Sequence, residues 1–232
     1  MTGSRRCVVV VHDPQDSIGV LPDIAAELDL DPFVVSVEDA LPAPSEVDCA
    51  IVLGSPESAY DSRLPWLAPE QLWLRALVSA SIPVFGVCFG SQALARALGG
   101  SVHRNHTPEI GWTPVDTADP ALLAPGPWLN FHFDAFTVPP RATEVARTAL
   151  APQAYVEGRC MGVQFHPEIS EEMYEGWQRY WRGSPSGARM LAGLGDLPER
   201  LRAELRERGD LNAKMCAELL GAFLERTATV GE

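Results

Sequence analysis

The stretch PVFGVCFGSQALARALGG, residues 83–100, places Cys88 between two glycines, where an apolar run gives way to a helical pattern. The apolar run at 82–87 predicts a buried strand, and the spacing at 89–98, which ends at a pair of glycines, predicts a helix. The form G-x-C-x-G at such a junction is typical of a nucleophile held on a tight turn. Glycines near a strand end also serve packing, however, and free cysteine is often buried. These residues alone therefore support a nucleophile and a core thiol equally.

Short β-branched runs alternate with amphipathic segments through the N-terminal part of the chain, which is typical of βα units around a parallel sheet. We expect strands at 7–12, 33–37, 48–53 and 82–87, and helices near 19–29, 66–80 and 89–98. The pattern then changes to short strand-like runs joined by turns, at 111–115, 128–133, 143–150, 153–158 and 160–165. Because no long helix separates these later runs, part of the sheet is expected to be antiparallel.

The chain beyond His166 is polar and helical in pattern. Asp196 and Glu199 form a capping box, and the apolar residues that follow predict two amphipathic helices. The apolar positions are Leu197, Leu201 and Leu205 for the first helix and Leu211, Met215, Leu219 and Phe223 for the second. We therefore expect one α/β domain at 1–183 and a C-terminal helical extension at 184–232. Packing of this extension on the same domain is favoured over docking of a second subunit.

The composition limits the domain size, the binding partners and the cellular location that we expect for this protein. The chain has 232 residues, nearly half of them apolar, which suits one α/β domain with an appendage. With 31 acidic side chains against 18 basic ones the net charge is −13, which disfavours nucleic acid or an anionic membrane as a partner. Five scattered cysteines without a CxxC pair indicate neither a disulfide framework nor a metal site. No apolar run resembles a signal peptide or a membrane span, so we expect a cytoplasmic protein. We also expect no metal and no cofactor.

A cysteine nucleophile needs a base, and the segment MGVQFHPEIS, residues 161–170, offers one. His166 follows an apolar strand, and Glu168 lies two residues further on. Along an extended segment, residues i and i+2 lie on the same side, so Glu168 can reach the ring nitrogen of His166 that faces away from the thiol. The sequence therefore allows a triad of Cys88, His166 and Glu168, provided that the two segments meet in space.

Several ordered segments together resemble the class I, triad-type glutamine amidotransferases, a family that includes the glutaminase domain of GMP synthetase and related γ-glutamyl peptidases. The segments are FGVCFGSQALARALGG (85–100), GVQFHPE (162–168), VLGSPESAYDSRLPWL (52–67), PEIGWTPV (108–115) and FHFDAFTVPP (131–140). The likeness extends to about Ile169, and the joint match strongly favours a nucleophilic Cys88. It implies a flavodoxin-like, doubly wound α/β fold with helices on both faces of a mostly parallel sheet.

The resemblance also implies a reaction. Cys88 would attack the side-chain amide of glutamine, His166 would take and return the proton, and Glu168 would hold the imidazole. The products would be ammonia and a γ-glutamyl thioester, which water hydrolyses to glutamate.

The resemblance extends to groups around the nucleophile. Backbone N–H groups of Phe89 and of the Gly54–Ser55 turn would form the oxyanion hole. The residues that match the substrate side of the family are Gln92, Phe131, His132 and Phe133. The chain departs from many members at Ser55, where they have a second glycine, and at Ser91, where many stand-alone members have a histidine. The first departure puts the close approach of backbone to the oxyanion in doubt, and neither departure removes a member of the triad.

Other chemically capable side chains have simpler interpretations. His132 is equally well explained as a hydrogen-bonded structural histidine, and His12, His103 and His106 are interpreted as ordinary loop or strand-end residues. We expect the remaining cysteines, Cys7, Cys49, Cys160 and Cys216, to be packed in the core. The six tryptophans, without a basic stripe beside them, are interpreted as core and pocket walls.

Three functions remain open. The chain has no G-x-x-x-x-G-K-[ST] phosphate loop, so a glutaminase would lend ammonia to a separate synthetase. The first alternative is a γ-glutamyl hydrolase or peptidase, in which the same triad cleaves a γ-glutamyl amide. The second is a non-catalytic regulatory subunit, which is disfavoured because packing does not require Cys88, His166 and Glu168 together.

Overall fold

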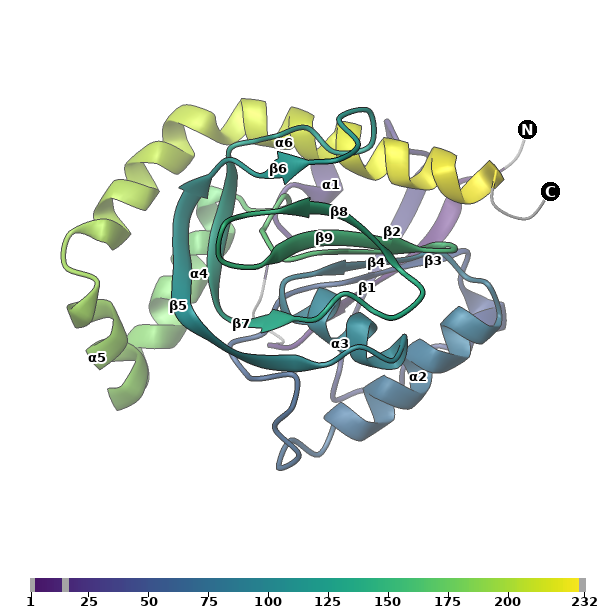
Figure 1. Ribbon diagram of the computed structural model, residues 1–232, viewed down its shortest axis with the longest axis horizontal. Helices are drawn as coiled ribbons and strands as arrows, with labels where there is room; N and C mark the ends of the chain where they lie inside the picture. Colours follow the sequence, from purple (N-terminus) through teal and green to yellow (C-terminus); the bar gives the residue numbers. More distant parts are fainter. Residues whose placement is uncertain (1–2, 14–16, 230–232) are drawn as a thin grey trace.

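The computed structural model describes residues 3–13 and 17–229, and its centre is a sheet that is parallel on one side and antiparallel on the other (Figure 1). Within the described residues, eight strands pair in the order β2-β1-β3-β4-β10-β9-β8-β6. The first five run parallel: β2 (Leu30–Ser36), β1 (Arg5–Val11), β3 (Cys49–Val52), β4 (Val84–Val87) and β10 (Cys160–Val163). The antiparallel strands are β9 (Pro152–Glu157), β8 (Thr143–Arg147) and β6 (Asp116–Thr117). The expected mixture of parallel and antiparallel strands is confirmed.

A separate two-stranded antiparallel ribbon carries part of the site. It pairs β5 (Val102–Thr113) with β7 (Trp128–Phe136), and its register shifts between Arg104 and Glu109. The sequence interpretation found most of β7 but recognised only the end of β5. Its residues 103–109 are largely exposed, and this part of the strand therefore lacks the alternation of apolar and polar residues that a half-buried strand shows.

Helices cover both faces of the sheet, as expected for a doubly wound fold (Figure 1). The helices are α1 (Leu21–Ile24), α2 (Leu67–Ser79), α3 (Phe89–Ala97), α4 (Glu171–Arg182), α5 (Pro185–Gly193) and α6 (Leu197–Thr229). Side chains along β1 alternate between the faces: Cys7, Val9 and Val11 share a core with α1, α4 and α6. Val8 and Val10 share the other core with α2 and α3. This is the pattern of a sheet buried on both sides.

Two expectations about helices were wrong. The helix expected near 19–29 comprises only Leu21–Ile24, because the chain turns through Asp29, at φ 52°, to enter β2. The two amphipathic helices expected after Asp196 are one continuous helix, α6, of 33 residues. Gly209 lies at the point where we expected a break, but a glycine weakens a helix without ending it. The apolar side of α6, from Leu201 to Leu224, packs in the same core as β1, β3 and β4.

The parallel strands place several loops at one edge of the sheet. His12 follows β1, Gly54 comes soon after β3, Cys88 follows β4 and His166 comes soon after β10. Carboxyl ends of parallel strands lie at the same edge, which is where open α/β sheets bind ligands.

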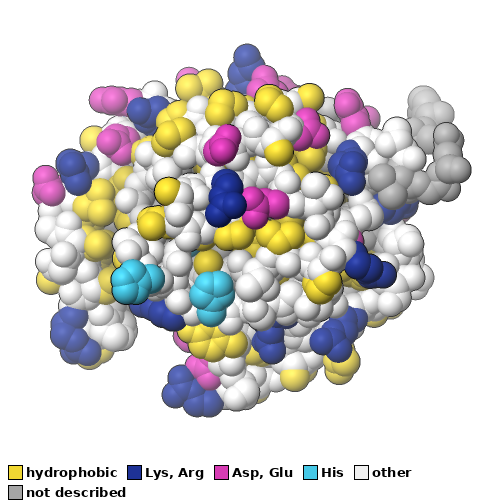
Figure 2. Space-filling view, in the orientation of Figure 1, with side chains coloured by type: hydrophobic (Ala, Val, Ile, Leu, Met, Phe, Trp, Pro, Cys, Tyr) yellow, Lys and Arg dark blue, Asp and Glu magenta, His cyan; other side chains and the backbone are white. Residues whose placement is uncertain are grey.

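None of the described helices combines the length and apolar character that crossing a bilayer requires. On the face drawn in Figure 2, lysine and arginine side chains are scattered among acidic ones rather than gathered in a stripe.

Candidate active site

Cys88 lies on the junction between β4 and α3 in a backbone conformation that L-residues rarely adopt, with φ 50° and ψ −109°. Such a conformation costs roughly 1–3 kcal/mol and persists only where neighbouring contacts impose it. The Cys88 N–H donates to the carbonyl of Val163 at 2.8 Å, while the Cys88 carbonyl accepts from the Gln92 N–H at 3.1 Å. The buried hydroxyl of Ser91 donates to the same carbonyl at 2.7 Å. The serine that replaces the family's histidine therefore helps to hold the strained turn.

The two flanking glycines are required by close packing. A Cβ on Gly90 would lie 2.0 Å from the carbonyl oxygen of Val52 in β3, and a Cβ on Gly86 would lie 2.6 Å from the carbonyl oxygen of Gly90. Both distances are shorter than any side chain tolerates, so α3 can approach the sheet only because both positions lack a side chain. The sequence pattern G-x-C-x-G thus has a packing cause, and that packing creates the strained turn at Cys88.

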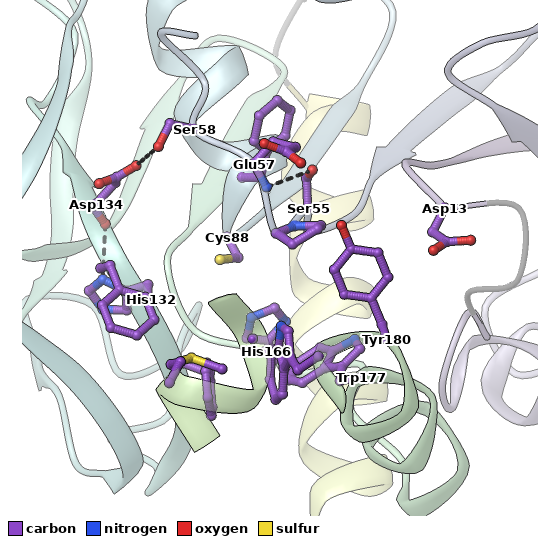
Figure 3. Close-up of a pocket in the computed structure, with 18 of the residues that line it drawn as sticks. Asp13, Ser55, Glu57, Ser58, Cys88, His132, Asp134, His166, Trp177 and Tyr180 are labelled. Carbon is purple, nitrogen blue, oxygen red and sulfur yellow. Dashed lines mark hydrogen bonds between the residues drawn. The ribbon is translucent and has the colours of Figure 1, made fainter. Parts of the chain in front are cut away.

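The segment after β10 brings His166 and Glu168 to this turn. Nδ1 of His166 lies 2.8 Å from Oε1 of Glu168, and the residues are only 3% and 1% exposed. A Cβ on Gly54 would lie 3.0 Å from Cε1 of His166 and 3.7 Å from Cβ of Cys88. The side chains of His166 and Cys88 therefore both lie next to Gly54. Figure 3 shows Cys88 with His166 below it and Ser55 to its upper right. The two segments that the sequence left unconnected do meet.

The environment of His166 favours its protonated form. Burial lowers the pKa of this imidazole, but the negative charges of Glu168 and of a Cys88 thiolate, with hydrogen bonds to both side chains, raise it to about 10. These contacts favour the charged form of the ring, which lies beside the carboxylate of Glu168 and near the side chain of Cys88. A positive charge beside a cysteine stabilises the thiolate, which is its reactive form.

The loop after β3 borders the cavity where the second half of the oxyanion hole is expected. Gly54 and Ser55 line the same cavity as Cys88 and Phe89, the first residue of α3. The Ser55 hydroxyl accepts a hydrogen bond from the Glu57 N–H at 3.2 Å, and Ser55 is not among the described residues with positive φ. This position therefore does not need the second glycine that many family members have.

Gln92 lies in the site, but its amide is held by the protein. It is 3% exposed, and its Nε2 donates to the carbonyl of Asp134 at 3.1 Å and to Oε1 of Gln164 at 3.3 Å. Nε2 of Gln164 in turn lies 3.7 Å from the sulfur of Cys88. Gln92 thus links α3 to β7 and to Gln164, two residues before His166. The sequence interpretation did not foresee this role.

The three expected substrate-side residues of β7 point in different directions. Phe131 and Phe133 contact each other, at 6.3 Å between ring centroids, and line the cavity. His132 is 3% exposed, with Nδ1 3.0 Å from the carbonyl of Asp134 and Nε2 3.3 Å from Oε2 of Glu109. Burial raises the pKa of Glu109, but His132 and two hydrogen-bond donors lower it further than burial raises it. His132 therefore has the contacts of a structural histidine, although it also borders the cavity.

The loop carrying Ser55 is tied to β7 through Asp134. The Ser58 hydroxyl donates to Oδ2 of Asp134 at 2.5 Å, and the Tyr60 hydroxyl donates to Oδ1 at 3.3 Å. Arg104 from β5 approaches the same carboxylate at 3.4 Å. These contacts fix one wall of the cavity, next to the nucleophile (Figure 3).

The opposite wall is aromatic and comes from α4 and α5. The cavity has a volume of ≈ 400 Å³ and extends from Cys88 to Trp177, Tyr180 and Trp181 of α4 and Met190 of α5. The ring of Trp177 lies edge-on to His166 at 4.7 Å between centroids, and Trp181 stacks on Phe131 at 4.5 Å. The interpretation of tryptophans as pocket walls holds for this pair. Their spacing of four residues, which puts both on one side of a helix, was the signal that could have located them.

The helix α6 supports the site from behind through Asn212, which is 2% exposed. Nδ2 of Asn212 donates to the carbonyl of Pro167 at 2.9 Å and to that of Ile169 at 3.2 Å. These carbonyls flank Glu168, so the C-terminal helix holds the segment that carries Glu168. The sequence interpretation did not single out this residue, because a polar residue in a helix gives no sign of which loop it contacts.

The other cysteines differ from Cys88 in their surroundings. All are buried, and burial is the main cause that raises the pKa of Cys160 to about 12 and that of Cys216 well above its ordinary value. The pKa of Cys7 is raised mainly by its hydrogen bond with Cys49. Their expected place in the core is confirmed, and Cys88 is the cysteine that lines the cavity among the described residues.

Comparison with known proteins agrees with this geometry. Residues 20–175 match the family model of the class I glutamine amidotransferases. A GMP synthase (glutamine-hydrolyzing) of Aeropyrum pernix is 36% identical over 166 residues, which cover 68% of this chain and 30% of that protein. The corresponding enzyme of Mycobacterium leprae is 40% identical over 130 residues, which cover 52% of this chain and 23% of that protein. The chain thus spans less than a third of the length of these relatives.

Solved structures share the fold over nearly the whole chain. A glutamine amidotransferase from Thermotoga maritima superimposes with a TM-score of 0.85 at 24% identity, covering 97% of this chain and 100% of that one. A glutamine amidotransferase from Methylobacillus flagellatus gives a TM-score of 0.80 at 22% identity, covering 97% and 96%. The expected flavodoxin-like α/β architecture is confirmed by these neighbours, and the family-model match extends from α1 into α4. This chain belongs to the class I glutamine amidotransferase family.

Proposed function

We propose that this protein hydrolyses the side-chain amide of glutamine, with Cys88 as nucleophile, His166 as acid and base, and Glu168 as the group that orients His166. The observation that carries the proposal is the strained turn at Cys88, with its flanking glycines, against a buried His166–Glu168 pair at 2.8 Å. The packing of the two glycines accounts for the strained turn, but it gives no reason for a cysteine at that turn beside a buried His166. A nucleophile activated by a neighbouring base gives one.

The proposed reaction has two steps. The sulfur of Cys88 attacks the amide carbon of glutamine, and the carbonyl oxygen becomes an oxyanion beside the N–H groups of Phe89 and Ser55. His166 gives its proton to the departing nitrogen, so ammonia leaves and a γ-glutamyl thioester remains. Water then attacks the thioester while His166 takes a proton from it, and the C–S bond breaks to release glutamate.

We further propose that the ammonia serves a separate acceptor enzyme. The matched GMP synthases are more than three times as long as the segment that they share with this chain, and their names describe a synthase that hydrolyses glutamine. A protein from Thermoplasma acidophilum with a TM-score of 0.60 and 21% identity is described as one putative subunit of a GMP synthase. A partner synthetase is therefore the first candidate acceptor.

A second candidate function is hydrolysis of γ-glutamyl amides larger than glutamine. The observation in its favour is the extension of the cavity along Trp177, Tyr180 and Trp181, because a volume of ≈ 400 Å³ is in the range that holds ligands larger than an amino acid. In that reaction the same thioester forms, and a larger amine leaves in place of ammonia.

Release of glutamate by the purified protein distinguishes these functions. The protein is offered glutamine and a panel of γ-glutamyl amides whose amines are alkyl, aromatic or cationic, with and without cell extract. Turnover of glutamine that rises with extract supports the ammonia donor, and much faster cleavage of one amide supports the hydrolase. If no substrate turns over and a thiol-reactive glutamine analogue does not label Cys88, the protein is non-catalytic and the proposal is wrong.

Replacing Glu168 with Gln should reduce kcat for glutamine by about 10²–10⁴-fold, the upper end being the loss that follows removal of the orienting carboxylate in serine-protease triads. The substitution removes one of the two negative charges that raise the pKa of His166 to about 10. The imidazolium should therefore lose its proton at a lower pH, and the alkaline limb of the kcat/KM profile should move down from that region. A profile measured from pH 6 to pH 11, within the range where both proteins are folded, tests this shift. An unchanged alkaline limb would contradict the assigned role of Glu168.

A further inference from the structure

His12 and Glu70 form a second buried pair next to the site, which the proposed reaction does not use. His12 follows β1 and Glu70 lies in the first turn of α2, and both side chains are fully buried. Nε2 of His12 lies 3.0 Å from Oε1 of Glu70, and its Nδ1 lies 3.0 Å from the carbonyl oxygen of Gly54. The sequence interpretation placed His12 at a strand end, which agrees with its position after β1, but it did not foresee that the ring is buried and contacts Gly54.

The acceptor at Gly54 fixes where the protons of this pair lie. A backbone carbonyl only accepts, so Nδ1 of His12 must carry a proton to bond with it. One further proton lies between Nε2 and Oε1 of Glu70, and it makes a hydrogen bond from either side. His12 is therefore held as a donor toward Gly54.

The carbonyl of Gly54 and the N–H of Ser55 belong to the same peptide unit. That unit is planar, and in the trans form its C=O and N–H point in opposite directions. A hydrogen bond that fixes the carbonyl of Gly54 therefore also fixes the direction of the Ser55 N–H. Drawing electron density toward the carbonyl oxygen makes the N–H on the other side a stronger donor.

The same ring contacts the other expected oxyanion donor. Its centroid lies 4.6 Å from that of the Phe89 ring, edge-on, and 5.2 Å from that of Trp66. Trp66 and Phe89 also pack against each other at 5.7 Å. His12 thus lies between the two segments whose N–H groups would bind the oxyanion, and it keeps them at a fixed separation.

We propose that His12, supported by Glu70, is a positioning residue for the oxyanion hole: it orients the Ser55 N–H through the carbonyl of Gly54. This inference rests on the proposed function and adds the device that prepares the hole before substrate binds. Donors held in place before the reaction stabilise a developing charge without a cost of reorganisation.

Two amide substitutions at His12 separate its two contacts. In His12→Asn the side-chain nitrogen is attached to the same carbon as Nδ1, so the donor to Gly54 is retained. In His12→Gln the nitrogen takes the place of Nε2, so the contact with Glu70 is retained and the donor to Gly54 is lost. We expect kcat for glutamine to fall roughly thirtyfold in His12→Gln and less than about fivefold in His12→Asn, since loss of a whole donor costs about 10²–10³-fold.

Binding of two ligands shows whether the loss concerns the oxyanion. A glutamate-derived γ-aldehyde adds the sulfur of Cys88 to its carbonyl carbon, and the resulting oxygen lies in the oxyanion hole. Its affinity should fall in His12→Gln by the same factor as kcat, while the affinity for the product glutamate should not change. A residue with only a structural role would weaken both ligands, or neither, in the variants. Equal kcat and equal aldehyde affinity in His12→Asn and His12→Gln would overturn the inference.

A measurement without substrate keeps this test separate from the proposed function. The amide resonance of Ser55 in the free, isotope-labelled protein should shift in His12→Gln and stay close to its wild-type position in His12→Asn. If the wild-type protein neither turns over glutamine nor binds the aldehyde, the proposed function fails, and the Ser55 resonance still tests the positioning. A Ser55 resonance that does not move in His12→Gln overturns the positioning itself.

Discussion

Replacing Cys88 with Ala should lower the rate of glutamine hydrolysis by at least about 10⁴-fold, because the proposed triad has no other nucleophile. The fold should remain intact. The side chain is 7% exposed and behaves as a small apolar group toward its neighbours, so alanine fits the site. Glutamate release under saturating glutamine measures the loss, and circular dichroism with a thermal melt checks the fold.

Cys160→Ala is the matched control for this substitution. Cys160 is a buried cysteine of β10 that lies outside the cavity, so its loss should change the melting temperature slightly and leave kcat as it is. Alkylation by iodoacetamide should label the wild-type protein and Cys160→Ala but not Cys88→Ala. Substantial turnover by Cys88→Ala would show that the proposed mechanism is wrong.

Replacing Gly90 with Ala should destabilise the protein by about 3 kcal/mol and displace the turn that carries Cys88. The added Cβ would lie 2.0 Å from the carbonyl oxygen of Val52, and a backbone atom of an interior strand cannot move aside as a flexible side chain can. Since α3 must shift to relieve this overlap, activity should fall further than the loss of folded protein explains. Denaturant unfolding together with kcat measures both effects.

Gly209→Ala provides the comparison, since Gly209 is also a helical glycine. A Cβ at Gly209 would have nothing within 4 Å, so alanine should stabilise α6 by about 0.5–1 kcal/mol through its helix propensity. If the free energy of unfolding falls in Gly90→Ala and rises in Gly209→Ala, then packing, rather than helix propensity, makes glycine necessary at residue 90. Equal stability of Gly90→Ala and the wild-type protein would contradict the close approach of α3 to β3.

The parts of the site that could be predicted from sequence are those governed by short-range rules. The pattern around Cys88 combines a strand end, two glycines and a helix start, and each has a local cause. The spacing of His166 and Glu168 follows from the geometry of an extended chain. Their meeting with Cys88 was supported by resemblance to a family, and the structure places these three side chains at one edge of the sheet.

The parts that could not be predicted depend on contacts between distant segments. His12 contacts Glu70, 58 positions away, and Asn212 contacts Pro167, 45 positions away. Neither residue has a neighbour in sequence that indicates its partner. The continuity of α6 through Gly209 was missed for a related reason, because the core on which the helix packs outweighs a local preference.

Through Asn212, the stability of the segment that carries Glu168 depends on the C-terminal helix α6. Because Asn212 holds the carbonyls on both sides of Glu168, lifting of α6 from the sheet would break two hydrogen bonds that hold the segment 166–169. Weakening the attachment of α6 should therefore speed the exchange of the amide hydrogens of that segment with solvent. Under the proposed mechanism, the fraction of molecules with Glu168 in place depends on a helix that lies entirely outside the matched family segment, so a partner that binds or loosens α6 should change that fraction.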